Sequence, residues 1–117
     1  LVKSKQRQIQ REFAMRRMMA EVPQADVVIT NPTHFAVALR YKFKEMDAPV
    51  VIARGQDFIA LKIKEIARDN GVVIVENPLL ARTLYYSTEI GDLIPQELHQ
   101  AVAEVLAFVY KQKKRVI

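Results

Sequence analysis

The 117-residue chain contains no cysteine, which excludes disulfides, zinc-thiolate sites and cysteine nucleophiles. Metal binding is therefore not expected. No apolar run approaches the roughly 18 residues that span a bilayer, so this stretch is not expected to cross a membrane. The only three glycines, Gly55, Gly71 and Gly91, form no phosphate-binding loop, and the carboxylates show no paired spacing on a shared element. The sequence therefore predicts no conventional active site, no cofactor and no small-molecule substrate.

Half of the residues are hydrophobic and no low-complexity run occurs, so the chain can bury one core and should fold as a single domain. It begins at Leu1 rather than Met, and residues 1–22 read as the continuation of an upstream part. They are polar and basic with a weak apolar stripe, which predicts a connector helix with little buried surface. Residues 23–117 are expected to form the domain itself.

The formal net charge of +5 is concentrated near the two ends of the chain, and the middle is nearly neutral. The basic residues of the two ends are Lys3, Lys5, Arg7, Arg11, Arg16 and Arg17, and Lys111, Lys113, Lys114 and Arg115. Such clusters are typical of nucleic-acid contacts, of a segment beside an anionic membrane face, and of plain solvated charge. The sequence leaves these three interpretations open.

Two strands are expected on either side of Asn31. Residues 25–30 form a short β-branched run, and residues 35–43 alternate with period two, which is typical of a strand with one face in the core. The side chains on this predicted core face are Phe35, Val37, Leu39, Tyr41 and Phe43. Residues 49–53 are expected to form a third strand, ended by Gly55, and residues 72–75 a fourth.

Helices are expected between and after these strands. Asp57 is the predicted N-cap of a helix that ends at Asn70 and Gly71, with an apolar stripe of Ile59, Ile63, Ile66 and Ala67. A short helix is expected over residues 78–86. The last helix should start near Pro95, and its predicted core face consists of Leu98, Val102, Val105, Leu106 and Val109.

The predicted fold class is α/β. A small central sheet of about four strands, made of a hairpin and a β-α-β unit, should be surrounded by helices, with the N-terminal connector helix extended from it. The β-α-β unit should be parallel with a right-handed crossover.

Asn31 is followed by Pro32, and this bond permits only one of the two usual asparagine side reactions. Deamidation requires the next backbone nitrogen to attack the Asn side chain, but proline has no N–H to lose. The remaining reaction is attack by the Asn31 amide nitrogen on its own backbone carbonyl, which closes a succinimide and expels the Pro32 nitrogen. The predicted result is a cut between Asn31 and Pro32.

Asn31, Pro32, Thr33 and His34 are predicted to form a β-turn. In such a turn the His34 backbone N–H can donate to the Asn31 carbonyl oxygen, polarise the carbonyl and stabilise the developing oxyanion. The His34 side chain would take the proton that the amide nitrogen loses, or pass one to the leaving proline nitrogen. Thr33 would tune the turn or donate its hydroxyl.

The second Asn-Pro pair, Asn77-Pro78, provides an internal comparison. Helical periodicity follows it, so Asn77 is the predicted N-cap and Pro78 the first helical residue. A side chain that caps a helix is not expected to attack its own carbonyl. His99 has no partner in the sequence and is assigned to the surface or to capping.

Residues 25–39, with the Asn31-Pro32-Thr33-His34 motif inside them, resemble the signature of the FlhB/YscU family of type III secretion proteins. The resemblance continues through residues 48–51, 55–57, 66–67, 76–82 and 91–95, and covers most of the chain after residue 12. The helix over residues 101–110 and the context of Phe35 resemble the flagellar branch more than the injectisome branch. Arg54 departs from the pattern, which more often has lysine there.

The resemblance implies that the chain is the cytoplasmic domain of a polytopic inner-membrane protein, whose transmembrane helices precede Leu1, at the cytoplasmic face of the bacterial inner membrane. Family members cut themselves between the motif Asn and Pro, which fall on Asn31 and Pro32 here, and the two pieces remain associated. The reaction is a single intramolecular turnover, so the chain is not expected to be a turnover enzyme. The implied site residues are Asn31, Pro32, Thr33 and His34.

The resemblance also implies a role and partners. Cleavage in the family permits the export apparatus to change from rod- and hook-type substrates to filament-type ones. The implied partners are other export-gate components, export substrates or their chaperones, and the hook-length control protein.

Two alternatives remain open. One is a basic nucleic-acid-binding module, although Phe35, Tyr41 and Phe43 are assigned to the core rather than to a stacking surface. The resemblance implies no nucleic-acid partner. The other alternative is a scaffold without chemistry, in which Asn31 substitutions would change neither chain length nor function.

Overall fold

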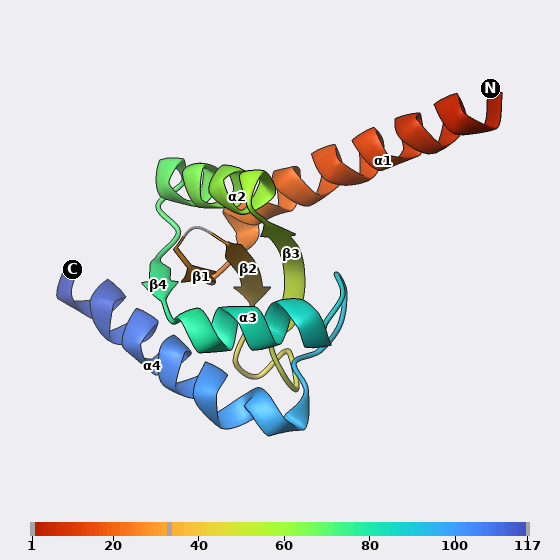
Figure 1. The fold of residues 1–117 in the computed structure, drawn as a ribbon. Helices are drawn as coiled ribbons and strands as arrows, with labels where there is room; N and C mark the ends of the chain where they lie inside the picture. The colour runs from red at the N-terminus through yellow and green to blue at the C-terminus, as the bar shows by residue number, and fades with distance from the viewer. Residues whose placement is uncertain (1, 33, 117) are drawn as a thin grey trace.

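Four strands form the centre of the molecule in a computed structural model that describes residues 2–32 and 34–116, with side chains up to residue 114 (Figure 1). The strands are β1 (Val27–Asn31), β2 (Phe35–Arg40), β3 (Val50–Gln56) and β4 (Ile74–Glu76), in the spatial order β3-β2-β1-β4. β2 is antiparallel to β1 and β3, whereas β4 is parallel to β1. β3 and β4 therefore run in the same direction, as the β-α-β prediction requires, with β2 and β1 between them. The α/β class with about four strands is confirmed.

Helices cover both faces of this sheet (Figure 1). The helical elements are α1 (Val2–Glu21), η1 (Val22–Gln24), α2 (Phe58–Asp69), α3 (Pro78–Ser87), η2 (Gln96–Leu98) and α4 (His99–Val116). α2 packs on one face with η1 and the C-terminal end of α1, whereas α3 and α4 pack on the other. The sheet is therefore the middle of three layers, with a separate core on each face.

The two central strands are buried on both faces because each core contacts them. Val27 and Ile29 of β1 lie in the core beneath α3 and α4, and Val28 lies in the core beneath α2. β2 alternates in the same way and places the small side chains Ala36 and Ala38 toward α2. Scission between β1 and β2 would thus divide a strand pair that two cores hold together.

β2 is shorter than predicted. The part of its core face that is confirmed consists of Phe35, Val37, Leu39 and, packed at the margin, Tyr41. The strand ends at Arg40 and Phe43 is 71% exposed, so the prediction of one strand over residues 35–43 with Phe43 in the core is wrong. The Tyr41 N–H donates to the Asp26 carboxylate (2.7 Å) instead of continuing the ladder, and Lys44 then turns the chain at a φ of +80°.

β3 and β4 also differ from their predicted bounds. β3 does not end before Gly55 but continues to Gln56, because Ala36 pairs with Gly55 and Phe35 with Gln56. β4 is Ile74–Glu76 rather than residues 72–75. At position 72 the backbone N–H still donates to the Ala67 carbonyl at the end of α2 (2.9 Å), which delays the strand.

α2 begins directly after Asp57, which is its N-cap residue as predicted, but the Asp57 side chain does not form the expected capping hydrogen bond. Asp57 has a φ of +52°, because β3 runs into α2 with one residue between them. Its backbone N–H donates to the His34 carbonyl (2.8 Å), and its carboxylate faces the His34 ring. The helix ends at Asn70 and Gly71, as predicted.

The apolar faces of the helices follow their predicted periodicity in most places. The fully buried residues of α2 are Ala60, Ile63 and Ala67, whereas Ile59 and Ile66 of the predicted stripe are half-buried. The predicted face of the last helix is confirmed, with Leu98 half-buried at its start. α3 spans the residues expected of the short helix.

α1 projects away from the rest of the molecule (Figure 1). Met18 is its one buried residue among those described. Ile9 and Phe13, which belong to the weak apolar stripe expected of residues 1–22, are 50% and 57% exposed. The prediction of a helix with little buried surface is confirmed, and the division of the chain at residue 22 stays a prediction. Among the described residues, no helix has the length and hydropathy that crossing a membrane requires.

Gly55→Ala is expected to lower the free energy of unfolding by about 1–3 kcal/mol, because a buried site is overpacked. A Cβ at position 55 would lie 2.9 Å from Cβ of Ile59, which fixes how closely α2 approaches β3. Urea unfolding measures the loss. Adding Ile59→Ala should recover part of it, because that substitution removes Cγ2 of Ile59, which would overlap the new methyl group, and leaves only the Cβ contact. Equal losses in the presence and absence of Ile59→Ala would contradict this explanation.

Candidate functional site

The Asn31-Pro32 bond lies where β1 turns into β2. Asn31 is the last residue of β1 and pairs with Phe35, the first residue of β2. The His34 backbone N–H donates to the Asn31 carbonyl oxygen at 3.0 Å, which confirms the predicted hydrogen bond of the turn. This donor polarises the carbonyl and can stabilise negative charge on its oxygen. Thr33, the remaining predicted site residue, lies outside the described residues.

Neighbouring elements hold the backbone on both sides of this turn. On the β1 side, the Asn77 N–H donates to the Thr30 carbonyl at 2.9 Å. On the β2 side, the Asp57 N–H donates to the His34 carbonyl at 2.8 Å. The β4–α3 and β3–α2 junctions therefore fix the two strand ends that flank the bond.

A lysine side chain reaches the turn itself. The Lys64 ammonium, on α2, donates to the Pro32 carbonyl oxygen at 3.1 Å. Asn31, Pro32 and Lys64 are all half-buried, so the bond lies at the edge of the molecule rather than in a core. In sequence Lys64 is 32 positions from Pro32, and only the packing of α2 on the sheet brings the two together.

The His34 ring points to the β3–α2 junction, where Nδ1 lies 3.7 Å from Oδ1 of Asp57. Both side chains are mostly exposed, at 64% and 72%, so the pair contributes little to stability. At this distance the two groups are within ion-pair range but form no hydrogen bond. The proton-transfer role predicted for His34 stays a prediction.

Asn77 has the structural role that was predicted for it. Its side-chain oxygen accepts a hydrogen bond from the Leu80 N–H at 3.3 Å, and its carbonyl accepts one from the Ala81 N–H at 2.9 Å. Both oxygens are therefore occupied at the start of α3. Asn31 is at the end of a strand, in a turn, so the two Asn-Pro pairs have different surroundings.

Sequence reasoning missed Lys64 and gave Asp57 only the role of a helix cap. No motif marks either residue as part of the turn, because their roles depend on how α2 and β3 pack. Asp57 carried one usable signal, its place in a run that resembles the family pattern. Lys64 carried none.

Arg54, which departs from the family pattern, lies on the α3 side of β3. Its guanidinium donates to the Tyr85 carbonyl (2.7 Å) and to the Glu89 carboxylate (3.3 Å). The guanidinium carbon also lies 4.1 Å from the centre of the Tyr85 ring. A planar guanidinium can stack and donate in several directions at once, which a lysine ammonium cannot do. Arg54 therefore attaches β3 to Tyr85 of α3 and to Glu89, and none of these contacts involves the turn.

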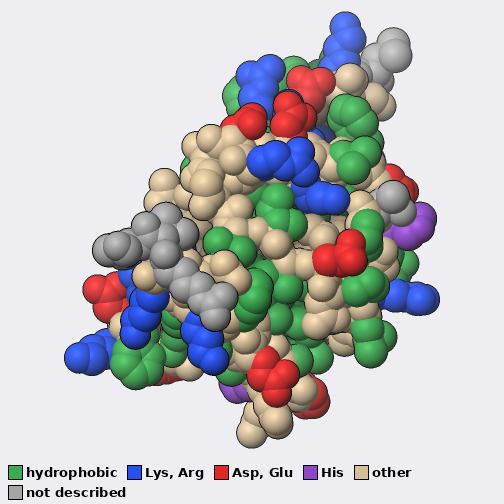
Figure 2. Space-filling model, turned by 90° about the vertical axis from the view of Figure 1, so that its left-hand side faces the viewer, with side chains coloured by type: hydrophobic (Ala, Val, Ile, Leu, Met, Phe, Trp, Pro, Cys, Tyr) green, Lys and Arg blue, Asp and Glu red, His purple; other side chains and the backbone are tan. Residues whose placement is uncertain are grey.

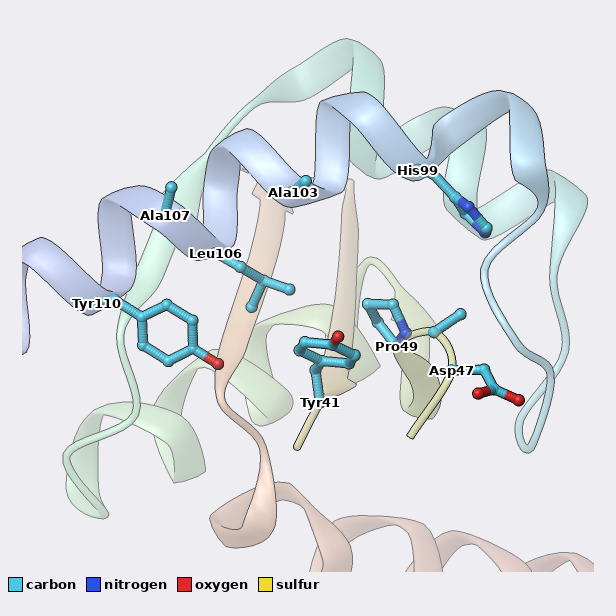
Figure 3. A pocket seen from close by; sticks show the side chains of 9 residues that line it. Tyr41, Asp47, Pro49, His99, Ala103, Leu106, Ala107 and Tyr110 are labelled. Atoms are coloured by element: carbon cyan, nitrogen blue, oxygen red, sulfur yellow. The ribbon is translucent and has the colours of Figure 1, made fainter. Parts of the chain in front are cut away.

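An apolar groove lies between α4 and the segment that joins β2 to β3 (Figure 3). Its volume is about 290 Å³, and its lining consists of Tyr41, Asp47, Ala48, Pro49, His99, Ala103, Leu106, Ala107 and Tyr110. Burial raises the pKa of the Tyr110 hydroxyl, and the Asp26 carboxylate and Tyr41 add smaller contributions in the same direction. The groove is at the opposite end of β2 from Asn31 and is separate from the turn.

His99 is the first residue of α4 and lies at the surface. His99 is exposed, and its Nε2 lies 2.9 Å from the Ile94 carbonyl, as expected of a surface or capping residue. Within residues 2–32 and 34–116, no three His, Asp or Glu side chains come together as metal ligands would. Among the described residues, the groups that lie at the turn are the asparagine amide, the backbone, the His34 ring and the Lys64 ammonium.

The family model and the curated relatives that match the chain belong to the same family. A family model described as the FlhB HrpN YscU SpaS Family matches residues 1–109. The flagellar biosynthetic protein FlhB of Bacillus subtilis (strain 168) is 55% identical over 116 residues, which cover 99% of this chain and 32% of that protein. The chain thus spans about a third of the length of this curated relative.

Solved structures agree with the sequence comparison. The crystal structure of the cytoplasmic domain of FlhB from Shewanella putrefaciens has a TM-score of 0.82 and 48% identity, covering 86% of this chain and 78% of that chain. A substituted EscU C-terminal domain has a TM-score of 0.75 and 30% identity, and the match covers 79% of this chain and 98% of that chain. EscU domains are also known with an asparagine, the proline that follows it, or a histidine two positions further on replaced by alanine.

That order and spacing are the ones Asn31, Pro32 and His34 have here. The match extends over nearly the whole chain, and both sequence and fold point to the same proteins. The chain therefore belongs to the FlhB, HrpN, YscU and SpaS family and has the fold of the cytoplasmic domain of FlhB.

Proposed function

We propose that the chain is a flagellar type III export domain that cuts itself between Asn31 and Pro32 by asparagine cyclisation. The observation that carries the proposal is the hydrogen bond from the His34 backbone N–H to the Asn31 carbonyl oxygen. It polarises the carbonyl of a residue that cannot deamidate by the usual route, because the proline after it has no backbone N–H. The reaction is a single intramolecular turnover rather than enzymatic catalysis.

In the proposed step, Nδ2 of Asn31 attacks the carbonyl carbon of the same residue and forms a C–N bond. The bond from that carbon to the Pro32 nitrogen breaks. The amide nitrogen loses one proton and the proline nitrogen gains one, so no co-reactant is consumed. The first products are a C-terminal succinimide at residue 31 and a free amine on Pro32, and water opens the succinimide afterwards.

Folding supplies the orientation that this step needs. Intramolecular placement of reacting groups can lower a barrier by about 7–11 kcal/mol, and the junctions at Asn77 and Asp57 limit the motion of the turn. The His34 N–H stabilises the oxyanion as it forms. The His34 ring takes the proton from the amide or delivers one to the proline nitrogen, and its contact with Asp57 orients it.

The proposed consequence of the cut is a change in which proteins are exported. The FlhB relative is named a flagellar biosynthetic protein, so the proposed role is a change of the exported class from rod- and hook-type to filament-type subunits. The proposed partners are other export-gate components, substrates or their chaperones and the hook-length control protein, with the domain at the cytoplasmic face of the inner membrane. In the full-length protein, Asn31→Ala should permit export of hook-type subunits and reduce that of filament-type subunits, measured by quantifying both in culture supernatants.

Pro32→Ala is expected to suppress the cut and to open deamidation instead, because the substitution restores a backbone N–H that can attack the Asn31 side chain. Intact-mass analysis should find one chain, part of it with the mass of the acid in place of the amide. His34→Ala should slow the cut without redirecting it, because the backbone N–H remains. Cleavage of Pro32→Ala at the wild-type rate would rule out the proposed dependence on proline.

The nucleic-acid alternative finds little support in the arrangement of charge. α1 and the end of α4 lie at opposite sides of the molecule, so the two basic ends do not form one patch (Figure 1). On the face shown in Figure 2, Lys and Arg side chains fall into separate groups with acidic and apolar side chains between them, and they form no continuous stripe. Failure to bind DNA or RNA at low ionic strength would dispose of this alternative.

A further inference from the structure

We propose that Lys64 is a positioning residue for the cut, because its ammonium holds the leaving side of the scissile bond. This inference rests on the proposed self-cleavage. The Lys64 Nζ donates to the Pro32 carbonyl oxygen at 3.1 Å, from an element remote in sequence. Among the described residues, Lys64 has no carboxylate partner within ion-pair distance, so this carbonyl is the group that its charge engages.

The place of Lys64 follows from how α2 packs. Ile63 and Ala67 are fully buried against the sheet, which fixes the rotation of the helix about its axis. Lys64 then lies at the margin of the buried face, half-buried, where its stem reaches the turn. Lys62, two positions earlier, is exposed, and its ammonium lies 3.9 Å from the Glu65 carboxylate. One helix thus carries one lysine that holds the turn and one that does not.

The two hydrogen bonds at the turn bracket the scissile bond. The Asn31 oxygen, on the acyl side, accepts from the His34 N–H at 3.0 Å, and the Pro32 oxygen, on the amine side, accepts from Lys64 at 3.1 Å. Ring closure requires Nδ2 to sit over the Asn31 carbonyl carbon, which depends on rotation about the adjoining backbone bonds. Holding both carbonyls restricts that rotation. Lys64 touches none of the reacting atoms, so its effect is on geometry.

The expected effect is measurable as a rate. A hydrogen bond from a charged donor is worth enough that its loss should slow the cut roughly tenfold. Lys64→Met removes the ammonium and keeps an unbranched side chain of similar length. Methionine is also a good helix former, so α2 should be preserved. Lys64→Arg keeps a cationic donor and should retain most of the rate. Lys62→Met is the matched control on the same helix and should cut at the wild-type rate.

The experiment follows the full 117-residue chain in a pulse-labelled cell-free synthesis, with the fraction cut read from denaturing gels over a chase. A chemical rescue distinguishes the loss of the Lys64 ammonium from a loss of folding stability. Because the chain has no cysteine, Lys64→Cys can be alkylated selectively with bromoethylamine, which restores an ammonium in the same folded sample. The rate of the uncut fraction should then rise toward the wild-type value. Melting of each variant in an Asn31→Ala background reports any loss of folding.

The outcomes are distinct. Cutting of Lys64→Met at the wild-type rate, or a slow Lys64→Cys that alkylation does not accelerate, would overturn the role of Lys64 and leave self-cleavage standing. Absence of any cut in the wild-type chain would overturn the proposed function and, with it, this inference. If Lys64→Met does not fold, the comparison of Lys64→Cys before and after alkylation decides the question.

Discussion

Asn31→Ala is expected to leave the chain in one piece, whereas the unaltered sequence yields fragments 1–31 and 32–117 on a denaturing gel. The substitution removes the only nitrogen that can close a succinimide on the Asn31 carbonyl. The turn itself should survive, because its hydrogen bond uses the backbone N–H of His34 and the backbone oxygen of residue 31. The loss of cutting should therefore be complete without a large loss of folding.

The second Asn-Pro pair supplies the control for this result. Asn77→Ala removes a helix cap, which costs about 1 kcal/mol, but it leaves Asn31-Pro32 intact and should not prevent the cut. No fragment should end at Asn77 in any variant. A cut in Asn31→Ala at the same position as in the wild type would show that the asparagine side chain is not the nucleophile.

Ile29→Ala is expected to lower the free energy of unfolding by about 2–5 kcal/mol, through lost burial and the cavity left behind. Ile29 is fully buried on the central strand, between Val37 of β2 and Val75 of β4. Urea unfolding measures this loss in the free energy of unfolding. The measurement is made in an Asn31→Ala background, in which the chain stays covalently whole. Ile9→Ala, on the exposed part of α1, should change stability by less than about 0.5 kcal/mol. Similar losses in both variants would contradict the two-core description of the sheet.

The same burial predicts what happens after the cut. β1 leaves with fragment 1–31, yet its side chains lie in both cores and its backbone pairs with β2 and β4. The fragments should therefore elute together under native conditions and separate in urea. In Ile29→Ala the separation should occur at lower urea.

The sequence predicted best those features that depend on neighbouring residues. The apolar face of α4 and the cap at Asn77 follow from helical spacing and from the dipeptide itself, and both are confirmed. The turn hydrogen bond between His34 and Asn31 is equally local.

The errors arise where a distant segment decides the local structure. Phe43 continues the alternation of β2, but Asp26 takes the Tyr41 N–H and ends the strand first. Asp57 has the composition of a cap, but the short β3–α2 junction imposes a left-handed φ and directs its carboxylate to His34. Lys64 reaches Pro32 only after α2 has packed. A one-dimensional pattern contains no record of such long-range contacts.

The most direct test of the account is the chemical identity of the ends that the wild-type chain produces. N-terminal sequencing and intact-mass analysis of the full-length preparation should find a new N-terminus at Pro32. The matching fragment should end at Asn31, either as the succinimide, lighter by one water, or as its hydrolysed form. A chain that stays whole under all conditions, or a new N-terminus at any other residue, would contradict cyclisation of Asn31 as the central event.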